Sequence, residues 1–537
     1  MAKVLRSNEH IAPYLSERLA YIRGLDPLGL QNNSEATFAM LLPGLNNVTG
    51  RLRYYSFYCW LLDQYSVHIG STNPKDQEAF IRKAELLLAL VMVQSGTEFN
   101  NIPGSNFASN YLQESTEIID LASGIYTEDH KTATTYWKYA TGAFGQYYVA
   151  SLINIGIVSS RADEAKLYSR TNTLEDAIFV SGEQLAKTFD VNIDPSHKSI
   201  FLEAVLSAQV SKSDLAPLFE SFNMMEIPLD TQEHQLLLQL LLQSDRMPLD
   251  AEEVPFHRKN TFRALLYFIH QQPVEKPTLA FVQNNYHRVI TEGLPTNETL
   301  FGWYYYQVND WFQFANTALF NGLLQELTTE YGLNYADLTT FCDVMSGKVL
   351  AELMDTYEIE EAVSLQDFIS QMESFVIDEV ELSDNILRYE GLDRIVYGFE
   401  LLIALFINNQ EHLEAIDTFG HRHGIKRDGE ASAYYLKKLT HKLSLSFKDF
   451  IYEYLVQNIV LRHHFVAFRK MGGGSQSTQK FVLEEGHIRY LGNFEPSFTG
   501  PRLTTLHAFL KDLKLVEQHN ITAKGIAVLN DEALWQK

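Results

Sequence analysis

Basic side chains in the C-terminal part of the chain are the residues whose type and spacing most clearly suggest a chemical role. Residues 421–537 contain 17 lysines and arginines against 11 aspartates and glutamates, although the net charge of the whole chain is −24. Clustered cations attract phosphate, so we expect this part to bind DNA or RNA, the alternative being a basic face without a ligand. The predicted nucleic-acid-binding residues are Arg462, Arg469, Lys470, Lys480, Arg489, Arg502, Lys511, Lys514 and Lys524.

A second pair of cations stands in the stretch GLNNVTGRLRYYSFYCW. Thr49 or Asn47 is suited to cap a helix that begins at Gly50. The apolar residues that follow point all round this helix, which is typical of a buried one. Arg51 and Arg53 then lie in its first turn, where the helix dipole disfavours cations. We therefore expect the two arginines to meet carboxylates of the acidic part of the chain or an anionic ligand.

Two groups of side chains have metal-binding potential. His421 and His423, with Asp428 or Glu430, would supply three ligands, but a glycine-bounded solvated basic loop explains this stretch better. The acidic run from Glu352 to Asp384 holds 11 carboxylates, and paired carboxylates can hold Mg²⁺ in a nuclease. We favour a solvated helical face there, or a docking surface for a basic partner. The sequence thus predicts no metal and no cofactor.

The glycine-rich stretch GGGSQSTQK lacks the spacing of a phosphate-binding loop, because Lys480 does not follow the second glycine of the G-x-x-x-x-G-K-[ST] pattern. A flexible linker is the better interpretation. The stretch WYYYQVNDWFQF is typical of a helix buried on several sides, although aromatic side chains also stack on bases. Nucleophile-elbow, zinc-protease, kinase and dinucleotide patterns are absent from the sequence, which does not decide whether the chain is an enzyme.

Helical periodicity dominates the chain and predicts a mainly α fold, a multi-helix bundle body with small winged-helix-like α+β modules. FVLEEGHIRYLG predicts a β-hairpin, and the order of a helix, DLKLV, a polar turn, ITAKG and a helix is typical of a winged helix. We divide the chain into an N-terminal helical region (1–135), a winged-helix-like module (136–194), an acidic helical body (195–420) and a basic winged-helix-like C-terminal module (421–537).

Composition is that of an ordinary globular protein, with 46% hydrophobic and 20% charged residues. Two cysteines, Cys59 and Cys342, make neither a disulfide framework nor a zinc cluster. The longest apolar runs, LLLALVMV and FELLIALFI, are far shorter than the ~20 residues that span a membrane. The N-terminus lacks the apolar run of a secretory signal. We expect a cytoplasmic protein without a membrane partner.

Two stretches carry a family resemblance. ATFAMLLPGLNNVTGRLRYYSFYCWLL resembles the N-terminal signature of large uncharacterised bacterial proteins encoded in phage-defence islands, and the segment from RHHFVAFRKM to NITAKG looks like the same kind of protein. Together they cover about a fifth of the chain, and their motifs are structural. The resemblance implies a role in anti-phage defence, with DNA recognition or complex assembly, and protein partners encoded nearby.

Three functions follow as hypotheses. In the first, the chain recognises DNA or assembles a defence complex through its winged-helix-like modules. In the second, it is an enzyme that acts on phage nucleic acid, such as a nuclease or a glycosylase, since one carboxylate and a base pocket are enough for base excision. In the third, it is a purely structural subunit of a larger complex.

The first hypothesis predicts that reversing charge in the C-terminal module weakens DNA binding. Arg502→Glu combined with Lys511→Glu should lower the affinity for DNA, because cations that meet phosphates are replaced by anions. Added salt should lower the affinity of the unmodified chain as well. Filter retention of labelled DNA over a salt series measures both effects, and a chain that retains no DNA at any salt concentration contradicts the hypothesis.

Overall fold

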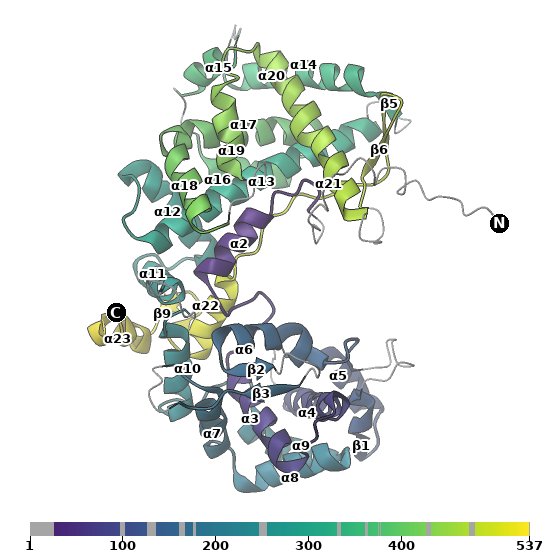
Figure 1. Ribbon diagram of the computed structural model, residues 1–537, viewed down its shortest axis with the longest axis vertical. Coiled ribbons are helices and arrows are strands. Elements are labelled where there is room, and N and C mark those ends of the chain that lie inside the picture. Colours follow the sequence, from purple (N-terminus) through teal and green to yellow (C-terminus); the bar gives the residue numbers. More distant parts are fainter. Residues whose placement is uncertain are drawn as a thin grey trace, which may run out of the picture. The chain divides into compact units, whose positions relative to one another are not determined.

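The computed structural model describes most of the chain. The described residues are 26–96, 102–125, 136–160, 167–174, 179–245, 255–329, 335–359, 364–373, 375, 377–425, 431–471 and 478–535. They form mainly helices with a few short antiparallel sheets (Figure 1), so the predicted mainly α body with small α+β modules is confirmed. Within these residues, no helix is both long and apolar enough to cross a membrane.

The chain divides into two compact units, and each unit combines distant parts of the sequence. One comprises residues 1–37 and 282–499, and we call it the α13 unit after its central helix. The other comprises residues 38–281 and 500–537, and we call it the α3 unit. The divisions fall inside α2 (Asn32–Leu41), inside α12 (Pro277–Glu292) and directly after Thr499. The segment 421–537, which the sequence suggests as one module, therefore contributes to both units.

The α13 unit is organised around α13 (Glu298–Thr329), a helix whose aromatic residues are almost wholly buried, as predicted. Its other described elements are β5 (Tyr335–Asp337), α14 (Leu338–Thr356), α15 (Leu365–Met372), α16 (Glu379–Arg388), α17 (Gly391–Asn409), η5 (Gln410–His412), α18 (Leu413–Arg422), α19 (Ser432–Thr440), α20 (Phe447–Tyr454), η6 (Leu455–Leu461), α21 (Arg462–Met471), β6 (Phe481–Glu484) and β7 (His487–Tyr490).

The predicted hairpin is present as β6 and β7, which pair antiparallel with Val482 opposite Arg489. Its two turn residues, Glu485 and Gly486, both have positive φ, as a two-residue type I′ turn requires. β5 pairs with the free side of β7 and completes a three-stranded sheet in the order β5-β7-β6. The alternation around Glu-Glu-Gly in the sequence was therefore sufficient to place this hairpin.

An extended segment after β7 lies along α13 and satisfies its buried polar groups. Asp310 Oδ1 accepts hydrogen bonds from the amide (2.9 Å) and hydroxyl (2.5 Å) of Thr499. Gln313 Nε2 donates to the Ser497 carbonyl at 2.8 Å, and Asn321 Nδ2 donates to the Phe494 carbonyl at 2.6 Å. Burial raises the pKa of Asp310 to about 6, and the bonds from Thr499 oppose that rise. Polar residues inside this otherwise apolar helix thus hold the segment that leads to the end of the unit.

The α3 unit contains α3 (Arg53–His68), which is buried on all sides, so the predicted core helix is confirmed. Its other described elements are α4 (Pro74–Gln94), α5 (Ser105–Glu114), β1 (Ile118–Asp120), η2 (Leu121–Gly124), η4 (Phe144–Tyr148), α6 (Val149–Ile155), β2 (Val158–Ser160), β3 (Tyr168–Arg170), α7 (Gly182–Val191), α8 (Pro195–Ser207), β4 (Gln209–Ser211), α9 (Lys212–Phe222), α10 (Gln232–Leu242), α11 (His257–Gln271), α22 (Leu503–Asp512), β8 (Val516–Glu517), β9 (Asn520–Ile521), α23 (Ala523–Asn530) and α24 (Glu532–Trp535).

The start of α3 differs from the prediction. The helix begins at Arg53 and not at Gly50, and neither Thr49 nor Asn47 caps it. The Asn46 side chain instead accepts hydrogen bonds from the amides of Val48 and Thr49, both at 2.9 Å, which fixes a turn ahead of the helix. Such Asx turns compete with helix formation at the same residues, which delays the first helical turn.

Close packing of α13 on α17 depends on a glycine, and a matched pair of substitutions tests this. A Cβ at Gly322 would lie 2.4 Å from Ile395 Cγ1 and 2.8 Å from the Gly391 carbonyl oxygen. A Cβ at Gly347, in α14, would meet nothing closer than Lys448 Cε at 3.9 Å. We expect Gly322→Ala to destabilise the fold by about 1–3 kcal/mol through overpacking. Gly347→Ala should stabilise it by roughly 0.5–1 kcal/mol through helix propensity. Denaturation midpoints of both variants compare the two effects, and equal shifts contradict this explanation.

Candidate functional site

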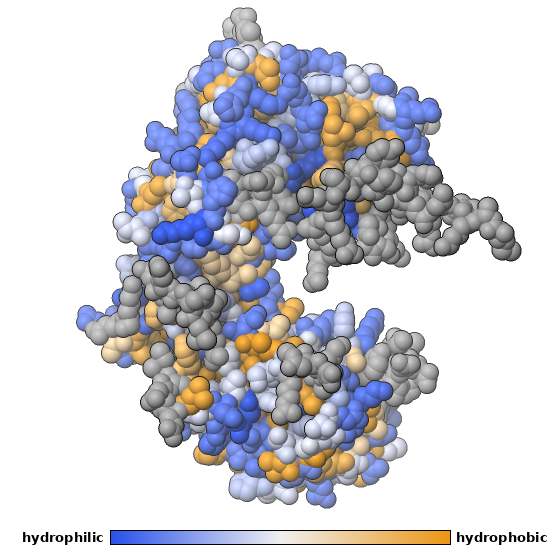
Figure 2. Space-filling view, in the orientation of Figure 1, coloured by the Kyte–Doolittle hydropathy of each residue, from blue (hydrophilic) through white to orange (hydrophobic). Residues whose placement is uncertain are grey.

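A cationic cavity of about 500 Å³ opens in the α13 unit between α19, η6 and α21. Its walls combine basic, aromatic and amide side chains from segments that the sequence separates by a loop and two helices. In Figure 2 the surface around α17–α20 is mostly hydrophilic, and a hydrophobic patch lies beside α20 and α21. The lining residues are Gly29, Tyr434, Tyr435, Lys438, Leu439, Lys442, Phe450, Tyr454, Gln457, Asn458, Arg462, Phe465, Val466 and Arg469.

A π-helical segment shapes one wall of the cationic cavity. α20 continues without a break into η6, where the backbone widens to the π-helical pattern, and then into α21. Short π-helical segments are rare inside α-helices and often occur at functional sites. The widened turn places Gln457 and Asn458 among the lining residues. These two amides add hydrogen-bond donors and acceptors to a wall that is otherwise basic and aromatic.

Each of three cations in the cavity lies over an aromatic ring. Lys438 Nζ is 4.2 Å from the ring centre of Tyr434, and the guanidinium of Arg462 is 5.4 Å from that of Tyr435. The guanidinium of Arg469 is 5.5 Å from the ring centre of Phe465, which is 49% exposed. These distances are typical of cation–π contacts, which hold a charge in place without neutralising it.

The electrostatic character of the cavity is positive. Among the described residues that line it, Lys438, Lys442, Arg462 and Arg469 carry the charge, and none is a carboxylate. Lys442 forms an ion pair with Glu453, which is outside the lining. A concave surface with several like charges concentrates its field, so this cavity is suited to an anionic ligand.

The floor of the cavity is apolar and fixed. Tyr454 is buried, and its hydroxyl donates to Asn316 Oδ1 on α13 at 2.8 Å. Burial raises the pKa of Tyr454, so the phenol is neutral. Phe450 lies beside it and is also buried. The basic rim therefore stands on a core that leaves little freedom for rearrangement.

Arg462 links the cavity to the first described residues of the chain. Its guanidinium donates to the carbonyls of Leu28 and Gly29 and to the Tyr435 hydroxyl. On the next residue, His463, burial lowers the pKa to about 4, so the ring is neutral at pH 7. Its Nε2 accepts from the Lys480 amide at 3.0 Å, so Nδ1 carries the proton and donates to the Pro27 carbonyl at 2.9 Å.

The predicted nucleic-acid-binding residues occupy different positions in the fold. Arg462 and Arg469 line the cationic cavity, whereas Lys470 is buried and donates to the Asp26 carbonyl. In the same unit, Lys480 follows the chain past His463, and Arg489 is exposed on β7 and pairs with Glu484 at 3.1 Å. The structure thus brings two of these five residues of the α13 unit into one cavity.

The remaining four predicted cations belong to the α3 unit. Arg502 is half-buried, with its guanidinium 5.3 Å from the ring centre of Phe38. Lys511 and Lys514 are exposed at the end of α22, and Lys524 Nζ is 3.8 Å from Asp230 Oδ1. They therefore form a basic surface of a different unit, not an extension of the cavity.

Sequence reasoning missed the part of the cavity that α19 and η6 supply. Tyr434, Lys438 and Lys442 lie in the stretch SAYYLKKLTHK, where basic and aromatic residues alternate at helical spacing. That alternation was the available signal. Gln457 and Asn458 had no signal, because the π-helical turn that directs them to the cavity does not appear in the sequence pattern.

Arg51 and Arg53 both meet carboxylates. Arg51 Nη1 lies 2.7 Å from Asp512 Oδ1, and the other oxygen of Asp512 accepts from the Leu52 amide at 2.9 Å. Burial raises the pKa of Asp512, and Arg51 opposes that rise. The acidic side chain that receives the first amides of α3 therefore comes from α22 and also offsets the charge of Arg51.

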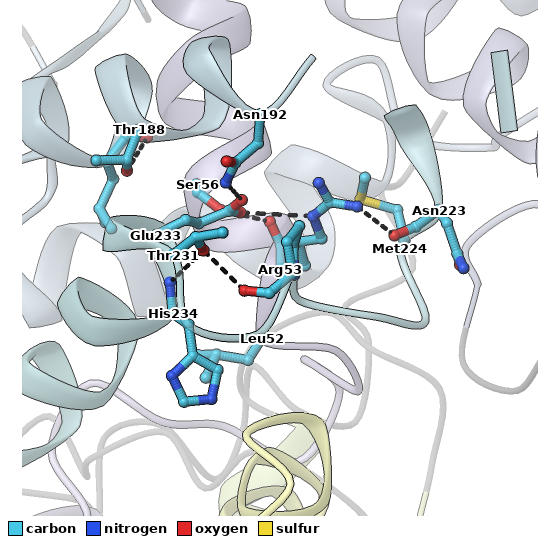
Figure 3. A network of polar contacts seen from close by, with 12 residues as sticks. Leu52, Arg53, Ser56, Thr188, Asn192, Asn223, Met224, Thr231, Glu233 and His234 are labelled. Atoms are coloured by element: carbon cyan, nitrogen blue, oxygen red, sulfur yellow. Dashed lines mark hydrogen bonds and ion pairs between the residues drawn. The ribbon is translucent and has the colours of Figure 1, made fainter. Parts of the chain in front are cut away.

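Arg53 belongs to a buried network centred on Glu233 (Figure 3). The Arg53 Nε atom is 3.5 Å from Glu233 Oε1, and Nη1 donates to the Asn223 carbonyl at 2.6 Å. Glu233 also accepts from the Ser56 hydroxyl at 2.5 Å and from Asn192 Nδ2 at 2.8 Å. The side chains of Arg53 and Glu233 are at most 3% exposed. This geometry places four elements, α3, α7, α9 and α10, around one ion pair.

The residues considered for metal binding are not assembled into a site within the described part of the chain. His423 Nε2 lies 3.0 Å from Glu298 Oε1, and Asp428 and Glu430 are outside the described residues. Among described residues, no group of three or more His, Cys, Asp or Glu side chains is arranged to hold a metal ion.

Comparison of the chain with protein-family models, curated proteins and solved structures gives no match.

The Glu233 network predicts a strong effect of removing one charge. Arg53→Leu should lower the free energy of unfolding by about 3–5 kcal/mol, because it leaves a buried carboxylate without its cation. Adding Glu233→Gln should recover part of this loss, because the second change removes the uncompensated charge. A double-mutant cycle from denaturation curves measures the coupling. Independent, additive effects of the two changes would show that the pair does not act as a unit.

Proposed function

We propose that this chain is a nucleic-acid-binding protein whose cationic cavity in the α13 unit contacts the sugar-phosphate backbone. The carrying observation is the concentration of Lys438, Lys442, Arg462 and Arg469 in one concave, carboxylate-free lining. This proposal keeps the function expected from the charge asymmetry of the sequence and names the residues that perform it.

Phosphate contact is the first part of the proposal. Lys438 and Arg469 are suited to it because each reaches the cavity from a different helix, α19 or α21. Arg462 is tied to Leu28, Gly29 and Tyr435, so it contributes fixed positive charge and not a mobile contact. Phosphates displace bound counterions from such groups, and this term dominates the affinity of most nucleic-acid-binding proteins.

Base stacking is the second part. Tyr434 and Phe465 are partly or largely exposed, and both stand beside a cation of the cavity. Single strands bind with their phosphates on basic groups and their bases on aromatic rings. The combination favours a single strand or an unpaired end, because bases inside a duplex are not available for stacking on side chains.

The wider biological role follows from the resemblance to proteins of phage-defence islands. We propose that the chain recognises phage nucleic acid as part of such a defence, together with partners encoded nearby. The α+β elements of the α3 unit, in which α22 and the β8–β9 hairpin precede α23, are the remaining candidates for winged-helix-like recognition. Their exposed Lys511 and Lys514 add a second basic surface.

Neutralising the cavity should weaken nucleic-acid binding. Lys438→Gln with Arg469→Gln should lower the affinity for a labelled single-stranded oligonucleotide by about tenfold or more at low salt. It should also reduce the slope of log affinity against log salt concentration by about 2, one unit for each lost phosphate contact. Fluorescence anisotropy over a salt series from about 50 to 200 mM measures both quantities.

A matched control removes the same charge outside the cavity. Lys437→Gln with Arg489→Gln takes two cations from the same unit, where they pair with Glu414, Asp417 and Glu484. This control should bind nearly as the unmodified chain does. Equal losses in the two variants would reduce the effect to net charge, and unchanged binding in the cavity variant would contradict the proposal. Phage plating on cells that express either variant tests the defence role.

A further inference from the structure

A second cavity, of about 710 Å³, lies in the α3 unit and has a different chemistry. It is formed where the loop before α3, the start of α5, the segment around Trp137, the π-helical η4 and helix α22 come together. Its described lining residues are Asn47, Val48, Gly50, Ile102, Pro103, Gly104, Ser105, Asn106, Phe107, Tyr136, Trp137, Tyr147, Thr504, Thr505 and Ala508. None of these side chains carries a charge, so electrostatic attraction of an anion is not what this cavity offers.

Aromatic rings form one side of this neutral cavity. Trp137 and Tyr147 meet edge to face, with ring centres 5.3 Å apart and planes at 89°. Phe107 meets Tyr136 in the same manner at 6.1 Å. Phe107, Trp137 and Tyr147 are partly exposed, whereas Tyr136 is buried behind them. Edge-to-face pairs fix the orientation of the rings, so they present a rigid stacking surface to a ligand.

A glycine allows this aromatic side to form. Gly104 has a φ of +76°, and a Cβ built on it would lie 2.0 Å from Cε2 of Tyr136. The Tyr136 ring therefore packs directly on the backbone at the start of α5, where any side chain would displace it. The position requires glycine for both its backbone conformation and its lack of a side chain.

Two buried charged residues of α4 hold the segments that carry Trp137 and Tyr147. Arg82 donates to the carbonyls of Gly124, Trp137 and Tyr139. Glu85 accepts from the amides of Ala143 (3.1 Å) and Phe144 (2.6 Å) at the start of η4. Burial raises the pKa of Glu85 to about 7, and these hydrogen bonds oppose the rise. The aromatic side is thus preorganised from beneath.

The opposite side is held as firmly. Thr505 Oγ1 donates to the Asn46 carbonyl at 2.7 Å, which joins α22 to the loop before α3. Asn46 Nδ2 donates to the Tyr147 carbonyl, also at 2.7 Å, and joins that loop to η4. Asn47 Nδ2 donates to the Gly500 carbonyl at 2.7 Å. Both sides of the cavity are therefore connected by hydrogen bonds between side chains and backbone, as in a built site.

Polar groups at the rim are suited to the edge of a heterocycle. Asn106 and Thr504 are exposed at the cavity, and Ser105 and the hydroxyl of Tyr147 lie among its lining. Asparagine pairs well with the donor–acceptor edges of bases, and hydroxyls match either kind of group. A cavity of several hundred cubic ångströms with an aromatic surface and a few polar groups has the size and composition of a small-ligand site.

We propose that this neutral cavity binds a nucleobase, which stacks on Trp137 and is recognised along its edge by Asn106 and Thr504. The uncharged lining favours an uncharged planar ring, and the rigid aromatic surface favours stacking over flexible contact. The base belongs either to a free nucleoside or to a single strand. The inference rests on the lining of the α3 unit alone and does not depend on the cationic cavity of the α13 unit.

Nucleoside titration of the full-length chain tests the proposal. Adenosine, guanosine, cytidine and thymidine, followed by saturation-transfer NMR, should include at least one that binds saturably, with signals strongest on the base protons. Trp137→Leu should weaken this binding by at least about tenfold, because the stacking surface is lost. Ala508→Leu should block it by filling the cavity from α22, where leucine is compatible with a helix. A short single-stranded oligonucleotide in parallel distinguishes a base in a strand from a free nucleoside.

Controls separate this site from general aromatic contact and from the cationic cavity. Tyr139→Leu removes an aromatic side chain that is 56% exposed and two residues from Trp137, but is not among the lining residues, so nucleoside binding should persist. It should persist equally in Lys438→Gln with Arg469→Gln. The proposal is overturned if no nucleoside binds at millimolar concentration, if Ala508→Leu binds as the unmodified chain does, or if only a neutral sugar such as glucose binds.

Discussion

The structure depends on satisfying guanidinium groups that are withdrawn from water. An arginine carries five N–H donors that stay charged at any ordinary pH, so burying it without partners would be very costly. In this chain Arg82, Arg258, Arg394 and Arg462 each donate to two or more backbone carbonyls. Each guanidinium thereby joins turns or helix ends that contact each other only through it.

This clamp serves the ends of helices in particular. Arg258 donates to the carbonyls of Leu240, Leu241 and Gln243 at the end of α10, and Arg394 does so for Ile386 and Tyr389 at the end of α16. The last carbonyls of a helix lack intrahelical donors and carry a partial negative charge, which a cation complements. The two cavities follow the same rule, because Arg462 fixes one rim of the cationic cavity and Arg82 fixes the wall of the neutral one.

The two cavities share a second feature and differ in chemistry. Each borders a π-helical segment, η6 or η4, which supplies Gln457 and Asn458 to one and Tyr147 to the other. The cationic cavity offers charge beside exposed rings, whereas the neutral cavity offers a rigid aromatic surface with amide and hydroxyl groups. Phosphate and base are the two parts of a nucleotide that such surfaces recognise separately, which gives the two units complementary chemistry.

The sequence by itself determined the helical class, the burial of α3 and α13, the β6–β7 hairpin and the concentration of positive charge near the C-terminus. These features depend on local periodicity, turn chemistry and composition, which neighbouring residues carry among themselves. Only the tertiary structure decided which cations share a cavity. Arg469 is joined by Lys438 from another helix, whereas Lys470, the next residue, is buried in a contact with Asp26. The pairing of Arg51 with Asp512 and the meeting of Trp137 with Thr504 join residues hundreds of positions apart. Such contacts are set by side-chain packing and the need to satisfy buried donors, and no local pattern records them.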